Sequence, residues 1–95
     1  MRFKMEITLA NAEGALERVL GCLRQRGFAL CSMMVDRTVD QTALEVRLTL
    51  ESARSMDLAQ KQVAKLYDVL NVEVKTMEVH ESNGYRQLQS ASPLK

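Results

Sequence analysis

The spacing of hydrophobic side chains changes abruptly near residue 11 of this 95-residue chain. Between residues 3 and 9 they alternate with polar ones, whereas from residue 16 onward they recur at intervals of three and four. Alternation is the period of a half-buried strand, and the longer spacing is that of an amphipathic helix. The pattern predicts a strand over residues 3–9 and a helix over residues 12–26, ended by Gly27.

The turn between these two elements holds an asparagine and a glycine. Asn11 is predicted to be the N-cap, because its side-chain oxygen can accept from an N–H of the first turn. Gly14 would then lie inside the helix, where it costs about 1 kcal/mol relative to alanine. One interpretation is that another chain, or a ligand carboxylate, approaches the backbone here. The other is a glycine merely tolerated in the first turn.

The next two segments have the pattern of a strand hairpin. Residues 29–37 carry hydrophobic side chains on both faces, and residues 43–50 alternate strictly. Residues 38–41 separate them and predict the hairpin loop.

A second helix and a fourth strand follow the hairpin. The helix is expected to begin near Ser52 or Ser55, either of which could cap it. Its stripe facing the sheet comprises Met56, Ala59, Val63 and Leu66. The strand begins near Val69, with a bulge or a change of buried face expected near Lys75 and Thr76, where the hydrophobic residues change frame.

This element order, β-α-β-β-α-β, predicts an α+β, ferredoxin-like fold. In that fold a four-stranded antiparallel sheet carries two helices on one face, with strand order 4-1-3-2. We assign residues 1–80 to this domain and interpret residues 81–95, which lack periodicity, as a mobile tail.

The strand order places residues 29–37 at an edge of the sheet. Ala29, Cys31, Met33 and Val35 are expected on one face and Leu30 and Met34 on the other. Such an edge is poorly protected against pairing with another chain, and we expect two copies to join edge to edge about a two-fold axis. The predicted dimer interface comprises Cys31, Met33, Met34 and Val35. Methionines that simply fill the core are the alternative.

Composition excludes several classes of function. Thirteen basic and twelve acidic residues give a net charge of +1, so no basic surface is expected for nucleic acid or membrane. There is no hydrophobic run of about 18 residues and no signal-peptide pattern, so the expected location is the cytoplasm. Cys22 and Cys31 have no metal-site or redox spacing, and we expect two reduced, largely packed thiols and no metal site. His80 and the scattered acidic residues show no catalytic grouping, so no catalytic residue is predicted.

Motifs along the chain resemble those of a known family. The fold order with Asn11-x-x-Gly14-x-Leu16 at the first turn resembles the ACT domain. Further motifs are similar to those of the small, regulatory subunits of acetolactate synthase, especially the short isozyme II form, a lone ACT domain. They are Gly14-Ala-Leu-x-Arg18-Val19, Gln25-Arg26-Gly27-Phe28, Ser32-Met33, Lys65-Leu66-x-Asp68-Val69, Leu16-Glu-Arg-Val-Leu20, Cys31-Ser-Met33 and Ser52-x-Arg-Ser-x-Asp-Leu58.

The resemblance implies a chain without cofactors that activates a large catalytic subunit. That subunit would carry thiamine diphosphate, magnesium and FAD, and would make the acetohydroxy acids that lead to branched-chain amino acids. In valine-responsive relatives the effector lies between the first turn of one protomer and the start of the second strand of the other. The corresponding residues here are Asn11, Ala12, Glu13, Gly14, Ala15 and Leu16 with Ala29 and Leu30.

Ala29 departs from the pattern of the valine-responsive relatives, which have asparagine at this position. Alanine offers no side-chain hydrogen bond, so the resemblance implies a weak or absent valine response. Exposed candidates for contact with the large subunit are Arg18, Arg24, Arg47 and Tyr67. The competing interpretation is a free-standing amino-acid sensor that acts as a dimer. A metal carrier on this fold would need a paired-cysteine loop, which the sequence lacks.

Overall fold

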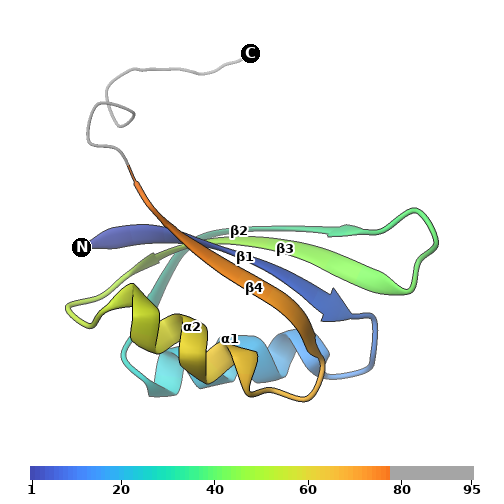
Figure 1. The fold of residues 1–95 in the computed structure, drawn as a ribbon, viewed down its shortest axis with the longest axis horizontal. Coiled ribbons are helices and arrows are strands. Elements are labelled where there is room, and N and C mark those ends of the chain that lie inside the picture. Colours follow the sequence, from blue (N-terminus) through green and yellow to red (C-terminus); the bar gives the residue numbers. More distant parts are fainter. Residues whose placement is uncertain (78–95) are drawn as a thin grey trace, which may run out of the picture.

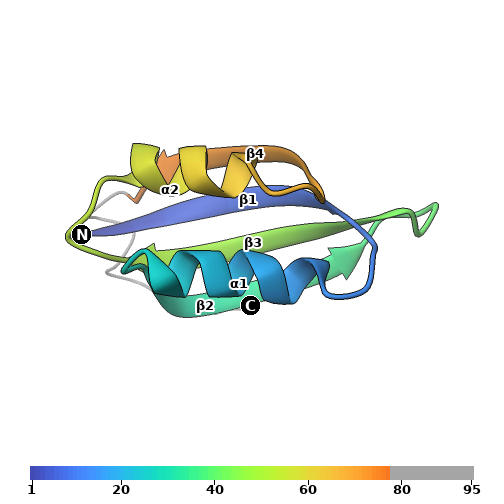
Figure 2. The same cartoon turned by 90° about the horizontal axis from the view of Figure 1, so that it is seen from below.

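The computed structural model describes residues 1–77, and its elements follow the predicted order. They are β1 (Arg2–Ala10), α1 (Ala15–Gln25), β2 (Ala29–Arg37), β3 (Ala43–Glu51), α2 (Met56–Ala64) and β4 (Val69–Thr76). The strands form one antiparallel sheet in the order β2-β3-β1-β4, and both helices lie against the same face of it (Figures 1 and 2). The ferredoxin-like prediction, including the strand order, is confirmed. The predicted boundary at residue 80, the tail and His80 lie outside the described residues.

The core lies between the sheet and the two helices. The predicted alternation of β1 places Phe3, Met5, Ile7 and Leu9 on the helix side, where all four are buried. Val19 of α1 and residues of β3 and α2 complete this layer, and the rings of Phe3 and Phe28 meet edge to face with centroids 6.0 Å apart. Among residues 1–77, no helix lies on the opposite face of the sheet (Figure 1).

The start of α1 differs from the prediction. The helix begins at Ala15, and its N-cap is Gly14 with φ of 79°, not Asn11. Asn11 instead joins the turn to the β2–β3 hairpin: its Nδ2 donates to the Gln41 carbonyl at 3.1 Å, and its backbone N donates to the Thr42 carbonyl at 3.0 Å. Because the asparagine side chain is used there, it does not reach the first turn of the helix.

A bulge in β2 changes the predicted faces of this strand. Leu30 pairs with Leu50 and Ser32 with Thr49, so Cys31 is an extra residue without an opposite partner. Strict alternation predicted Leu30 on the same face as Met34. In the structure Leu30 instead lies on the helix-covered face, with Met33 and Val35. The expectation of two packed thiols is wrong for Cys31, which is exposed at the bulge, while Cys22 is partly buried.

The irregularity in β4 also lies elsewhere than predicted. Its register shifts opposite Thr8 and Leu9, where Asn71 and Val69 are the partners, so Leu70 is the extra residue. Lys75 and Thr76 pair with β1 in regular register up to the end of the strand. The predicted slip near these two residues is therefore wrong, and the irregularity leaves Leu70 exposed.

The caps of α2 and the hairpin loop follow the sequence closely. Ser55 is the N-cap of α2, and its hydroxyl accepts from the Leu58 N–H at 3.2 Å. In the predicted loop, the Asp40 carboxylate accepts from the Thr42 N–H and from the hydroxyls of Thr38 and Thr42. These bonds, the Thr42 N–H first, lower the pKa of Asp40. Their stabilisation of the hairpin is thus present above the ordinary aspartate pKa and is lost as the pH falls through the lowered value.

Candidate functional site

The first turn is closed by a side chain of its own helix. Arg18 Nη2 donates to the Glu13 carbonyl at 3.3 Å and forms an ion pair with Asp68. A Cβ on Gly14 would lie 2.9 Å from Arg18 Nη1, and the positive φ of Gly14 is rarely adopted by L side chains. The backbone conformation and the chain's own arginine thus account for this glycine, which does not by itself indicate a ligand.

Asp68 connects the α2–β4 junction to this turn. Its side chain is nearly buried, and it pairs with Arg18, whose side chain is 54% exposed. Its carbonyl also accepts from the Ala10 N–H at 2.8 Å, directly before the turn. Of the arginines proposed for subunit contact, Arg18 therefore has a defined internal partner. Residue-by-residue reasoning missed Asp68; the only sequence signal for it was its place in the motif Lys65-Leu66-x-Asp68-Val69.

The start of α1 offers backbone donors. Within residues 1–77 no side chain caps this helix. The Ala15 N–H donates to the Ala12 carbonyl at 3.1 Å and the Arg18 N–H to the Gly14 carbonyl at 3.0 Å, which leaves the amides of Leu16 and Glu17 as the uncapped donors. The uncapped N–H groups of a helix start can bind a small carboxylate. The predicted effector residues 11–16 thus form one continuous turn at one end of the sheet (Figure 1).

Ala29 and Leu30, the other predicted effector residues, lie in the same chain at the opposite end of the sheet from the turn of residues 11–16. They border a small hollow of about 150 Å³ beside the end of α1, which Leu23, Arg24 and Phe28 also line. Ala29 pairs with Glu51, at the end of the sheet where β1 begins, whereas Asn11 follows the end of β1. One chain does not bring the two halves of the predicted site together.

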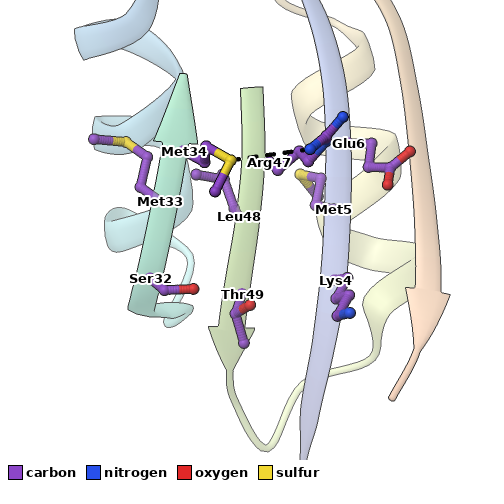
Figure 3. Close-up of a pocket in the computed structure, with 9 residues that line it drawn as sticks. All are labelled: Lys4, Met5, Glu6, Ser32, Met33, Met34, Arg47, Leu48 and Thr49. Carbon is purple, nitrogen blue, oxygen red and sulfur yellow. Dashed lines mark hydrogen bonds between the residues drawn. The ribbon is translucent and has the colours of Figure 1, made fainter. Parts of the chain in front are cut away.

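The outer edge of β2 is open and partly hydrophobic. Met33 is 44% exposed and Met34 57% exposed, and no strand within residues 1–77 pairs with the outer side of β2. Figure 3 shows the two methionines pointing to opposite sides of the strand, with Met34 Sδ directed toward Arg47 Nη1 at 3.9 Å. This is the edge that the sequence predicted for self-association.

A shallow hollow of about 420 Å³ crosses the open face of the sheet. Its charged side chains are Lys4 and Glu6 of β1 and Arg47 of β3, with Ser32, Met34 and Thr49 beside them (Figure 3). It contains none of the predicted effector residues. Among residues 1–77 there is no grouping of three or more histidine, cysteine or acidic side chains that could hold a metal ion. No helix in this part of the chain is long and hydrophobic enough to span a bilayer.

Two glycines near α1 should respond to alanine substitution with opposite signs. Gly14→Ala forces a side chain into a left-handed conformation and displaces Arg18, so we expect a loss of about 1–2 kcal/mol in the free energy of unfolding. Gly21→Ala, inside α1 with open space around it, should gain about 0.5–1 kcal/mol. Urea unfolding of both variants measures the difference. A Gly14→Ala protein as stable as the parent would show that the turn relaxes freely.

Comparisons with known proteins agree with this fold. The sequence model of the family described as "ACT domain" matches residues 11–72. The chain is 36% identical over 74 residues to the acetolactate synthase isozyme 2 small subunit of Escherichia coli (strain K12), a match that covers 78% of this chain and 85% of that relative. It is 37% identical over 73 residues to the isozyme 3 small subunit of the same strain, covering 76% of this chain but only 45% of that relative.

A solved structure gives the same architecture at low identity. The crystal structure of the ACT domain from the GTP pyrophosphokinase of Chlorobium tepidum superposes with a TM-score of 0.66 at 10% identity, covering 78% of this chain and 96% of that chain. At this identity the likeness concerns the fold alone. The two relatives from Escherichia coli are more informative about the family, because each is more than one third identical over about three quarters of this chain.

Proposed function

The chain belongs to the ACT-domain family as a non-catalytic small subunit of acetolactate synthase, and we propose that it raises the activity of the large, catalytic subunit. The observation that carries the proposal is the match over 85% of the isozyme 2 small subunit. Thiamine diphosphate, magnesium and FAD would be held by the large subunit, and the pair would work in the cytoplasm.

Self-association through β2 is the second part of the proposal. An antiparallel pairing of two β2 edges about a two-fold axis places the start of the partner's strand beside the end of this one. That end leads into the hairpin to which Asn11 is bonded. The second copy's strand start, at position 29, would therefore approach the turn of residues 11–16, which supports a composite effector site made by two chains.

Activity measurements test the proposal directly. Acetolactate formation by the matching large subunit should rise strongly when this chain is added, and the two proteins should co-sediment. No activation and no complex would favour the free-standing sensor instead. That alternative predicts that an amino acid stabilises the isolated chain by RT ln(1 + [L]/Kd), which thermal unfolding would detect.

Ala29 is proposed to weaken the response to valine. Ala29→Asn restores a side chain that can donate and accept, and one such bond contributes about 0.5–1.5 kcal/mol, or roughly a 2- to 10-fold gain in valine affinity. The measurement is a valine titration of the reconstituted enzyme. Ala53→Asn, at an exposed loop position, is the matched control and should leave the titration unchanged. Equal titrations for the parent and Ala29→Asn would remove Ala29 from the site.

A further inference from the structure

We infer that the α2–β4 junction, residues 65–70, is the surface that contacts the acetolactate synthase large subunit, with Tyr67 and Leu70 as its hydrophobic anchors. The inference rests on the proposed function, since it names the contact through which the large subunit would be regulated. It concerns a part of the molecule distinct from both the turn of residues 11–16 and the β2 edge.

Tyr67 is a large aromatic side chain fully in solvent on a fixed backbone. Its exposed fraction is 97%, although the residues on either side of it are held: Leu66 packs against the core, and Asp68 is buried and paired with Arg18. A rigid aromatic side chain loses little conformational entropy when a partner covers it, which is why tyrosine is frequent among residues that dominate binding energy. The structure thus presents the Tyr67 ring in solvent, on a backbone held by the residues on either side of it.

Leu70 extends this surface along the edge of the sheet. The bulge turns its side chain outward, where it is 63% exposed, and it borders a groove of about 410 Å³ between α2 and β4. Gln60, Lys61 and Ala64 form the helix side of the groove. Within residues 1–77 no strand pairs with the outer side of β4, so backbone groups along this edge are also available.

The charges of the junction disfavour a second copy of this chain as the occupant. Lys61 lines the groove, and Lys65 lies one helical turn further along and is exposed. A two-fold interface over this surface would contain both lysines from each of the two chains, and like charges that come close in an interface are unfavourable. The chemistry instead fits a different protein that offers a hydrophobic pocket bordered by acidic side chains. The large subunit is the partner that the small-subunit relatives imply.

The position of the junction also allows both contacts at once. The order β2-β3-β1-β4 puts β2 and β4 at opposite edges of the sheet (Figure 2), so a dimer through β2 leaves the junction uncovered. Asp68, in the middle of the junction, is joined to the turn of residues 11–16 through Arg18 and Ala10. A displacement of that turn would therefore be transmitted to the surface that carries Tyr67.

The test uses the whole chain with its purified large subunit. Tyr67→Ala should raise the concentration of chain that gives half-maximal activation by about tenfold or more, because truncating a central anchor commonly has an effect of this size. Leu70→Ser should act in the same direction, and Lys61→Glu should weaken activation most at low salt. Tyr67→Phe should restore activation to within about threefold of the parent, since the ring carries most of the buried area. Val39→Ala, at another fully exposed hydrophobic residue, is the control and should change nothing.

Sedimentation and thermal unfolding of the isolated variants separate the possible outcomes. The parent's association state and its unfolding temperature should be retained in every variant, because Tyr67 and Leu70 are largely exposed within the chain. Parent-like activation by both Tyr67→Ala and Leu70→Ser would overturn the inference, as would a changed association state in either. Failure of the parent chain itself to bind or activate the large subunit would refute the proposed function, and the inference with it.

Discussion

Replacing Met33 by lysine is expected to convert the proposed dimer into folded monomers. Met33 lies on the helix-covered face of the β2 edge opposite Leu48 and is 44% exposed, so a lysine there reaches water in the single chain. In an edge-to-edge dimer the same lysine enters the seam, and the two-fold axis introduces it twice. We expect association to weaken by about 3 kcal/mol, or more than roughly 100-fold. Sedimentation equilibrium measures the change, and circular dichroism checks that the fold is intact.

The control for this experiment is Val39→Lys. Val39 is a fully exposed hydrophobic residue at the hairpin tip, outside any strand. A lysine at this position introduces the same charge without entering the β2 pairing. It should leave association unchanged. A folded Met33→Lys protein that stays dimeric at the parent's concentrations would show that self-association uses another surface.

Arg18→Ala should lower the free energy of unfolding by more than the removal of an arginine from an ion pair in which both side chains are exposed. It removes the ion-pair partner of Asp68, whose side chain is 9% exposed, and leaving a buried polar group unsatisfied costs about 1–3 kcal/mol. For a domain of this size, each kcal/mol lowers the unfolding temperature by about 4–8 °C. Thermal and urea unfolding measure the loss, and a cycle with Asp68→Ala isolates the interaction energy between the two side chains.

The ion pair between Arg2 and Glu51 provides the control for the Arg18 substitution. Arg2 and Glu51 also form an ion pair, at 3.4 Å, but both side chains are more than half exposed. Exposed pairs contribute about 0–1 kcal/mol, so Arg2→Ala should cost little. Equal losses for Arg2→Ala and Arg18→Ala would mean that the Arg18 pair is screened like a surface pair and does not fix the turn.

The fold could be predicted because its core strands and helices have clear periods. Strict alternation in β1 and β3 and the stripe of α2 place their buried residues correctly. The two bulges could not be predicted in the same way. In β2 hydrophobic residues fall in both frames, so no pattern distinguishes Leu30 from Cys31 as the residue facing the core. In β4 the Ala10 N–H donates to the Asp68 carbonyl just before the strand, and Leu70 is the extra residue in the pairing that follows.

In the candidate site, too, the sequence predicts the local turn but not the contacts made across the fold. The turn of residues 11–16 was found from the change of period and from its motif, and the structure has a turn there. Its cap was assigned wrongly because Asn11 bonds to a hairpin that lies 30 residues further along the chain. The Arg18–Asp68 pair, 50 residues apart, likewise depends on how α2 meets β4. Contacts of this kind are set by tertiary structure, and a local pattern does not encode them.

The bond between Asn11 and Gln41 has a consequence for how finely an effector response could be tuned. A ligand that binds the Asn11 amide must compete with the Gln41 carbonyl for it. The apparent Kd of such a ligand equals its intrinsic Kd divided by the fraction of molecules in which the amide is free of this bond. Substitutions in the β2–β3 hairpin that weaken or strengthen this bond would then shift the threshold concentration of the effector without contacting the effector itself. Over evolutionary time, related subunits could acquire different sensitivities through loop residues alone.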